Sequence, residues 1–445
     1  MLDLAELFNP IALWIPILLP AAIVALALLC SSVNCRMAFV AVGGFAVLQS
    51  STRFDAAKGL YAIVFTLVFA IALFKAWSCR DRHWTLLSVS AVLFALAGLS
   101  LFVALAHGNS PGNWLRDVAS LLLLAAAPIF ALDAQHLESP SATLTIFVVA
   151  GVAAAIAFVL ERLGGRHLAQ SGQTWFLYTF LLPVALFSYA AAESFAGTGA
   201  GRLLWIVVSG AVASLLLASS GRSAFAVLLL PVAMVFIRRG SLLRAMIRAV
   251  EIGALAALLF YLVAAHFAHL AGVKRQTIIK HLLEVETLVH NPHSDPSFRA
   301  RLYQTLAAAP VFLQSPLLGA GPGRVFTFKG FDGKPMATFA IFDTPLAFPA
   351  KYGLVGIGLL LVAASALCGF IRSIVRERGM TPPVLALISY ALFSIGRMLL
   401  GSPFDDKGYS MGLMFLLALC LIDARSAFAP CSGAESRRAE HDGYP

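Results

Sequence analysis

Long apolar runs separated by short charged segments fill most of this chain of 445 residues. A helix of about 20 apolar residues crosses the roughly 30 Å hydrocarbon core of a bilayer. Hydrophobic residues make up 60% of the chain and charged residues only 12%, whereas a soluble domain carries about 25% charge. We therefore expect an all-α, polytopic integral membrane protein with 12 or 13 transmembrane helices.

The expected spans cover residues 10–33, 36–51, 57–77, 84–106, 114–134, 141–160, 173–195, 202–219, 221–237, 246–268, 346–371, 383–400 and 409–424. The run 36–51 is short, so it is either a tilted span or a re-entrant segment.

Arginine clusters predict the orientation, because cytoplasmic loops of membrane proteins are enriched in Lys and Arg. Strict alternation of the spans brings three clusters to one side, which we assign to the cytoplasm: Arg80 and Arg82; Arg238, Arg239, Arg244 and Arg248; Arg372, Arg376 and Arg378. The chain then divides into N-terminal helices (1–269), a large periplasmic loop (270–345), C-terminal helices (346–425) and a polar cytoplasmic tail (426–445).

Cysteine placement agrees with this orientation, because free thiols are protected in a reducing cytoplasm. All six cysteines fall in the expected cytoplasmic half or tail: Cys30, Cys35, Cys79, Cys368, Cys420 and Cys431. No CxxC motif or Cys/His pairing predicts a metal site. The net charge of +10 comes mostly from the cytoplasmic arginines, which favours anionic lipid headgroups over nucleic acid as the partner. Asp3 and Glu6 precede the first span in place of basic residues, so we expect that span to be retained.

The loop 270–345 is far longer than a simple connection between helices, so we expect it to contain short helices of its own. Apolar residues at helical spacing predict an amphipathic helix on the membrane surface over 281–289. Asp295 followed by Pro296 predicts the start of a second helix. This helix carries Arg299 and Arg301 and ends before Ser315.

A glycine-rich run follows, in the segment Pro316-Leu317-Leu318-Gly319-Ala320-Gly321-Pro322-Gly323. The unhindered backbone N–H groups of such a run can form an anion-binding nest, in which Gly321 and Gly323 would bind substrate. The alternative is a plain turn that leads to the next segment. Arg324, Lys329 and Lys334 follow directly and favour an anionic ligand.

Two further arginines lie where apolar spans end. Arg222 follows Ser219-Ser220-Gly221, and Arg397 lies in the motif Ser394-Ile395-Gly396-Arg397. Each is either an interfacial anchor that snorkels to the headgroups or a ligand for phosphate, to which a guanidinium donates two parallel hydrogen bonds.

The segment from Arg301 to Gly323 resembles the extracytoplasmic loop of the O-antigen ligase and polymerase superfamily, whose pattern is an Arg, a short helix and then PLLGxGxG. The stretch around Arg222 is similar to the Ser-Arg motif of the same family. This resemblance implies a metal-independent glycosyltransferase without cofactor in the bacterial inner membrane. Such an enzyme moves a glycan from undecaprenyl pyrophosphate to a saccharide or lipid A-core acceptor at the periplasmic face.

This chain departs from the family at one position. Typical ligases have a His-Asn pair shortly before a Gly-x-x-Gly that opens the helix after the loop. Gly353-Leu354-Val355-Gly356 is present, but Phe342 or Asp343 stands in place of the histidine. Asp343 is either a general base or a helix N-cap. Loss of the histidine favours a polymerase-like or otherwise diverged transferase over a ligase.

The resemblance thus assigns catalytic roles to Arg222, Arg301 and Asp343, and substrate binding to a second set: Arg299, Arg324, Arg397, Gly321 and Gly323. The expected partners are the lipid-linked glycan donor, the saccharide acceptor, membrane lipids and polysaccharide assembly proteins. Two alternatives stay open, a flippase for lipid-linked oligosaccharides and a non-catalytic scaffold of an assembly complex.

Overall fold

The computed structural model describes most of the helical part of the chain, and every structural statement below concerns these residues. They are residues 25, 28–29, 31–43, 56–78, 80–135, 140–164, 180–218, 227, 229–238, 242–271, 296–329, 335–338, 344–398 and 407–426. Side chains are placed for most of them.

The described chain is almost entirely helical, as the sequence predicts. The helices before the loop are α2 (Val33–Ala38), the π-helix η1 (Phe39–Gly43), α4 (Ala56–Ser78), α5 (Arg80–Ala106), α6 (Pro111–Ala134), α7 (Pro140–Gly164), α9 (Leu181–Ala196), α10 (Gly199–Ala218), α12 (Leu229–Arg238) and α13 (Leu242–Ala271). The remaining elements are α15 (Pro296–Gln314), β1 (Phe326–Lys329), β2 (Pro335–Thr338), α16 (Ala347–Arg378), α17 (Pro382–Met398) and α18 (Lys407–Ser426).

Five of the described helices are long and apolar enough to cross a membrane. Their apolar stretches are Leu60–Ser78, His83–Ala106, Pro111–Ala134, Gly199–Leu216 and Ala347–Arg378. Each coincides with a span expected from hydropathy, and shorter apolar helices coincide with several of the others. The run 36–51 begins as a short α-helix followed by a π-helix.

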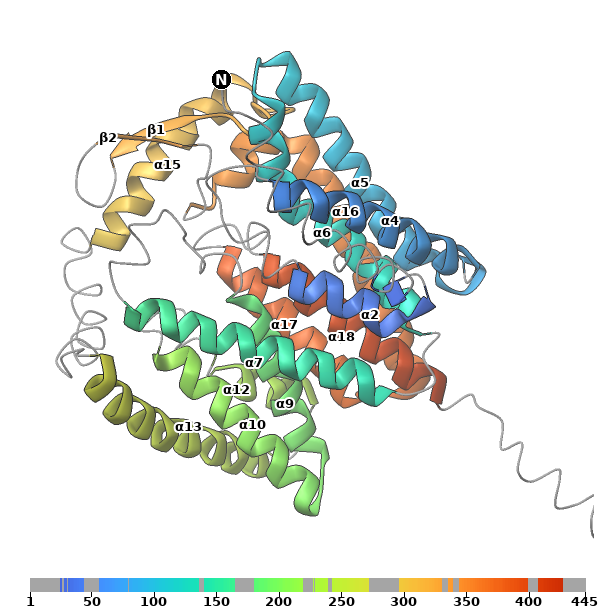
Figure 1. Ribbon diagram of the computed structural model, residues 1–445, viewed down its shortest axis with the longest axis vertical. Coiled ribbons are helices and arrows are strands. Elements are labelled where there is room, and N and C mark those ends of the chain that lie inside the picture. Colours follow the sequence, from blue (N-terminus) through green and yellow to red (C-terminus); the bar gives the residue numbers. More distant parts are fainter. Residues whose placement is uncertain are drawn as a thin grey trace, which may run out of the picture.

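Helices α6 and α18 pack against each other at the centre of the bundle. Helices α4, α5 and α16 lie on one side of them in Figure 1, and α7, α9, α10, α12 and α13 lie on the other. In the apolar 18-residue stretch of α6, 78% of the residues are buried, whereas in that of α16 only 17% are buried. Since α16 is also more hydropathic than α6, its outer side suits lipid better than water.

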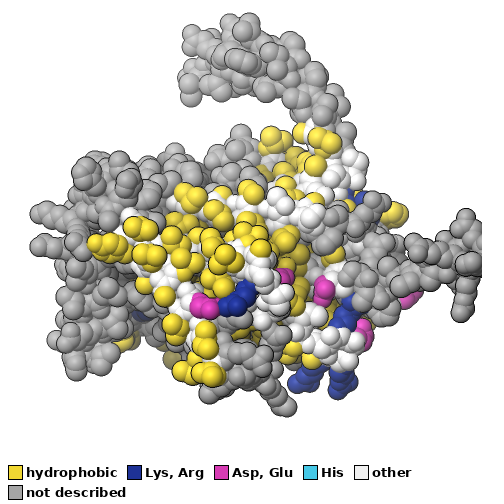
Figure 2. All heavy atoms as spheres, turned by 90° about the horizontal axis from the view of Figure 1, so that it is seen from below, with side chains coloured by type: hydrophobic (Ala, Val, Ile, Leu, Met, Phe, Trp, Pro, Cys, Tyr) yellow, Lys and Arg dark blue, Asp and Glu magenta, His cyan; other side chains and the backbone are white. Residues whose placement is uncertain are grey.

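Apolar side chains also cover the face formed by α10 and α13. Figure 2 views the molecule from below and shows hydrophobic side chains spread over the described part of this face, with few charged ones among them. The exposed residues include Leu203, Leu204 and Val207 of α10 and Leu258 of α13. Exposed apolar surfaces of this extent are typical of membrane or protein interfaces.

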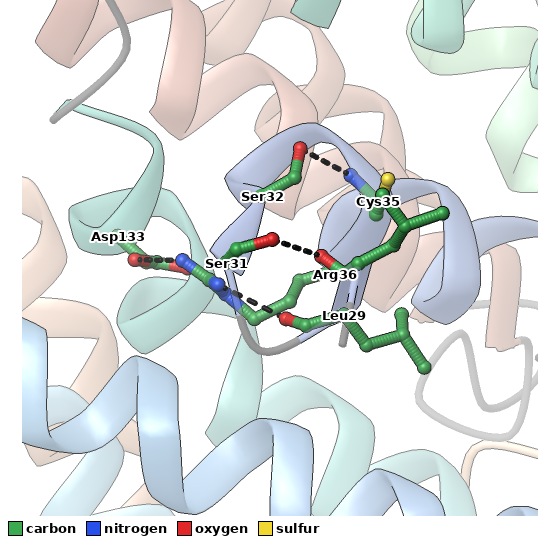
Figure 3. Close-up of polar contacts among 7 residues, drawn as sticks. Leu29, Ser31, Ser32, Cys35, Arg36 and Asp133 are labelled. Carbon is green, nitrogen blue, oxygen red and sulfur yellow. Dashed lines mark hydrogen bonds and ion pairs between the residues drawn. The ribbon is translucent and has the colours of Figure 1, made fainter. Parts of the chain in front are cut away.

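A fully buried ion pair joins α2 to α6. The Arg36 guanidinium donates to both carboxylate oxygens of Asp133, with Nε 2.6 Å from Oδ2 and an Nη 2.8 Å from Oδ1 (Figure 3). Its other Nη donates to the Leu29 carbonyl at 3.1 Å. Both charged side chains are 0% exposed, so the two charges compensate each other where water does not reach.

Polar contacts connect helix ends that the predicted alternation of spans brings to the cytoplasmic side. The pairs are Arg36 with Asp133, Arg202 with Glu251 at 2.7 Å, and Arg378 with the Asp423 carbonyl at 2.6 Å. The junction of α5 with α6 instead lies beside the start of α16, at the end predicted to be periplasmic. The arrangement of the described ends therefore follows the order expected from the sequence.

The loop region differs from the expectation in one respect. Helix α15 covers Pro296–Gln314, which confirms its predicted end before Ser315. Its predicted cap, Asp295, lies outside the described residues. The all-α prediction is wrong for the next segment, because β1 and β2 form a two-stranded antiparallel sheet in which Phe326 pairs with Thr338. Along β1, Phe326 and Phe328 are buried while Thr327 and Lys329 are exposed. The helix predicted over 281–289 lies outside the described residues.

We predict that Asp133→Ala destabilises the protein strongly. Removal of one partner from a buried ion pair costs about 3–5 kcal/mol, because the other charge stays buried and uncompensated. Glu251→Ala is the matched control: its pair with Arg202 is about one-third exposed, so the change should cost about 0–1 kcal/mol. Unfolding in mixed detergent micelles measures both, and equal unfolding midpoints for the two variants would contradict the prediction.

Candidate functional site

The glycine-rich turn 316–323 is built into the first turns of α16. The backbone N–H of Ala320 donates to the Ala350 carbonyl at 2.9 Å, and that of Gly321 donates to the Lys351 carbonyl at 3.0 Å. In return, Leu354 N–H donates to Pro316 at 2.9 Å. Val355 N–H donates to Leu317 at 3.0 Å, so the two glycine motifs found in the sequence form one hydrogen-bonded unit.

Gly353 makes this exchange of hydrogen bonds geometrically feasible. Its φ of 63° interrupts the helical backbone of α16 and lies in the left-handed region, which glycine adopts without steric cost. A Cβ atom at this position would collide with the Leu317 carbonyl and the Gly319 N–H. Gly353 therefore ends a short first helical segment and begins the long apolar one.

A buried ion pair fastens the same unit to α6. Lys351 Nζ donates to Asp117 Oδ1 at 2.6 Å, and the side chains are 2% and 1% exposed. The second carboxylate oxygen of Asp117 accepts the Gly323 N–H at 2.8 Å. These two partners of the carboxylate, Lys351 and Gly323, are both remote from Asp117 in sequence.

These contacts correct the interpretation of the glycine run as a nest for a substrate anion. The N–H of Gly321 is used by Lys351, and the anion that Gly323 holds is the carboxylate of Asp117. The carbonyls of the turn are engaged as well, since the Asn109 amide donates to Ala320 at 2.8 Å. Residues 319–323 of the turn form a buried structural joint, which is the alternative that the sequence left open.

Helix α15 packs on this joint through a small apolar core. Ala308 of α15, Phe326 and Phe328 of β1, and Ala347 and Ala350 of α16 form that core.

A polar contact adds to this core. The hydroxyls of Thr305 on α15 and Thr344 before α16 lie 2.7 Å apart, and Thr344 also accepts the Leu346 N–H at 3.3 Å. Helix α15 is thereby fixed relative to the start of α16.

Arg301 lies on α15 one turn from Thr305, whose hydroxyl donates to the Arg301 carbonyl at 2.8 Å. The residue is partly buried. Its Nε atom is buried and has no hydrogen-bond partner among the described residues. An unsatisfied buried donor costs about 1–3 kcal/mol, so this Nε has capacity for an acceptor, as does the buried Nε of Arg202.

The other predicted arginines are distributed over several elements. Arg299 is exposed in the first turns of α15, and Arg324 is partly buried between the glycine turn and β1. Arg397 lies in the last turn of α17, where its guanidinium stacks 5.0 Å from the centre of the Phe180 ring before α9. Three of the candidates thus belong to the loop region, and Arg397 belongs to another part of the bundle.

Arg222 and Asp343, the other two residues with predicted catalytic roles, lie outside the described residues, as does Lys334. The neighbour of Asp343 is informative, because Thr344 makes the side-chain hydrogen bond at the turn into α16. The N-cap of α16 itself, Leu346, has no side-chain capping hydrogen bond.

No family model and no curated protein matches this chain. The resemblance of its loop to the O-antigen ligase and polymerase superfamily therefore rests on the motif residues quoted above. In the described part of the chain, no cluster of His, Cys, Asp or Glu is arranged to hold a metal ion. The described cysteines, Cys35, Cys368 and Cys420, are free thiols.

Sequence reasoning missed Asp117, Lys351 and Asn109, the residues that hold the joint. A signal was present, since Asp117 and Lys351 each lie inside an expected span. A charge within a membrane span needs a partner. Pairing the charges of different spans, instead of neighbours in sequence, would have connected the two residues.

We predict that Gly321→Ala loosens this joint. A φ of 77° costs an alanine roughly 1–2 kcal/mol, and its Cβ would lie 2.6 Å from Ala104 Cα. Gly358 of α16 is the control, since a Cβ there meets nothing within 4 Å and Gly358→Ala should stabilise the helix by about 0.5–1 kcal/mol. Protease cleavage of the loop, measured in detergent, should rise only for Gly321→Ala. Unchanged cleavage of that variant would refute the prediction.

Proposed function

We propose that this chain is a multi-pass glycosyltransferase of the bacterial inner membrane, with 12 or 13 spans and a periplasmic active face. It would move a glycan from undecaprenyl pyrophosphate to a saccharide acceptor, as O-antigen polymerases and ligases do. The observation that carries the proposal is the unsatisfied hydrogen-bond donor of Arg301. This residue holds a buried, unpartnered Nε on a helix that is clamped to the ends of apolar spans.

The reaction is a displacement at the anomeric carbon of the donor. The acceptor hydroxyl forms the new glycosidic bond, the bond to the pyrophosphate oxygen breaks, and undecaprenyl pyrophosphate leaves with the bonding electrons. Negative charge on the leaving group is the main barrier, and fixed cationic donors stabilise it without reorganising. Arg301 would bind the pyrophosphate, with Arg324 and Arg222 as further cationic groups, and the hydroxyl proton would pass to Asp343 or to water.

A flippase for lipid-linked oligosaccharides is the second candidate. One observation favours it: α6 carries a buried carboxylate near each end, Asp117 and Asp133, each paired with a cation from another element. Charged groups inside the bundle are typical of transport pathways. The two candidates differ in their product, because a flippase moves the donor across the bilayer without forming a glycosidic bond.

Arg301→Ala in purified protein tests the transferase. Each hydrogen bond to a charged group is worth about 1.5–3 kcal/mol, and about 1.4 kcal/mol changes a rate tenfold. Glycan transfer in proteoliposomes that contain a polyprenyl-pyrophosphate-linked oligosaccharide should therefore fall by roughly one to two orders of magnitude. Arg301→Lys should recover part of it, since lysine keeps the charge and loses the planar fork.

Gln314→Ala is the matched control, because Gln314 is exposed at the end of the same helix. Full transfer by a folded Arg301→Ala variant would remove Arg301 from the site. Transbilayer movement of the donor without any transfer product in the wild-type protein would identify a flippase.

Asp343→Asn separates catalysis from capping. Asparagine caps a helix as well as aspartate does, so a general base predicts loss of transfer with unchanged stability. A cap alone predicts that Asn is silent and that Asp343→Ala costs about 0.5–2 kcal/mol of stability. Transfer rate and unfolding midpoint of both variants decide between the two roles. Full activity of the Asn variant would exclude Asp343 as the base.

A further inference from the structure

Helix α15 turns an apolar face outward. Leu306 and Leu313 are 61% and 74% exposed, and Pro310 between them is exposed as well. Residues at this spacing share one side of a helix. The opposite side is the buried one, with Ala308 and Gln304 facing the protein. The helix thus carries apolar residues on both sides, an inner set packed on β1 and α16 and an outer set left uncovered.

This apolar face continues across the glycine turn onto α16. Leu317 and Leu318 of the turn are 64% and 44% exposed, and Leu354 of α16 is 50% exposed. The hydrogen bonds from Leu354 and Val355 to the turn hold these side chains next to one another. One band of exposed leucines therefore runs from α15 through the turn to the apolar segment of α16.

The outer side of α16 extends the band along the bundle. Leu361 and Val362 are 61% and 54% exposed, within an apolar window that is only 17% buried. Where α16 crosses a bilayer, this surface contacts acyl chains. The band on α15 is continuous with it.

The position of α15 fits a membrane interface. In Figure 1, α15 lies at one end of the bundle and runs crosswise to α7 and α13. A cation lies at one end of this apolar face, where Arg299 is exposed seven residues before Leu306 on the same helix. Basic residues beside an apolar face are typical of helices that lie at the boundary between headgroups and acyl chains.

We propose that the leucine band, defined as Leu306, Leu313, Leu317, Leu318 and Leu354, docks α15 into the headgroup and acyl boundary of the membrane. The occupant is lipid, because the band continues the exposed apolar surface of α16, which contacts acyl chains when α16 spans a bilayer. Docking leaves the inner side of α15, with Thr305 and its contact to Thr344, against the protein. This inference rests on the membrane placement of α16 and is independent of the chemistry proposed for Arg301.

Lipid quenching of a fluorophore tests the docking. Leu313→Cys in the full-length protein is labelled with bimane and reconstituted in liposomes that contain a phospholipid with a nitroxide near the headgroup end of its acyl chain. Labelled wild-type protein supplies the background from native cysteines. Leu361→Cys on α16 is the lipid-facing control, and Thr327→Cys, exposed on β1, is the water-facing control. Leu306→Cys repeats the measurement should Leu313→Cys fail to fold.

We expect quenching at Leu313 to reach at least half of that at Leu361 and to exceed that at Thr327 several-fold. Quenching at Leu313 equal to that at Thr327, with Leu361 quenched, overturns the docking and leaves the membrane placement of α16 intact. A disulfide-linked dimer through Leu313→Cys would show a second copy of the chain as the occupant. Protection from both nitroxide lipid and aqueous iodide would show a covering loop segment. Each of these two results also overturns the proposal, as does absence of quenching at Leu361.

Discussion

Backbone hydrogen bonds between the glycine turn and the first turns of α16 hold the loop region on the helical bundle. They require Gly353 to leave the helical conformation, because only then do the N–H groups of Leu354 and Val355 reach the carbonyls of the turn. The pair of Asp117 with Lys351 adds a tie from α6. Removal of either charge would leave the other buried and uncompensated, which is the costly case. The placement of α15, and with it Arg301, follows from this joint.

Two kinds of buried charged group bear on the proposed function. Arg36 pairs with Asp133, and Lys351 pairs with Asp117, so these buried charges connect helices to one another. Arg301 is the contrasting case, with a buried Nε that no described residue accepts from. The proposed transferase depends on this difference in pairing, since stabilisation of the leaving group needs hydrogen-bond donors that are not already paired within the protein.

Hydropathy predicted the five long apolar helices of the described residues, because an apolar run of about 20 residues is a local property of the sequence and does not depend on details of packing. The end of α15 before Ser315 was also predictable, since Ser315-Pro316 acts locally on the backbone. The role of the glycine run was not, because the occupancy of its N–H groups depends on Lys351 and Asp117, both distant in sequence. The β1–β2 hairpin was missed although Phe326 and Phe328 alternate with polar residues, a pattern too short to stand out in an apolar chain.

The ion pair between Arg36 and Asp133 also constrains the order in which the chain is assembled. The two residues are 97 positions apart, with α4 and α5 between them. At about 5–20 residues per second of synthesis, Arg36 waits roughly 5–20 s for its counterion. Until then the buried Arg36 guanidinium has no carboxylate to compensate its charge. Completion of the N-terminal helices during biogenesis therefore awaits the arrival of α6, and a nascent chain cut short before Asp133 would present an unsatisfied guanidinium to the insertion machinery.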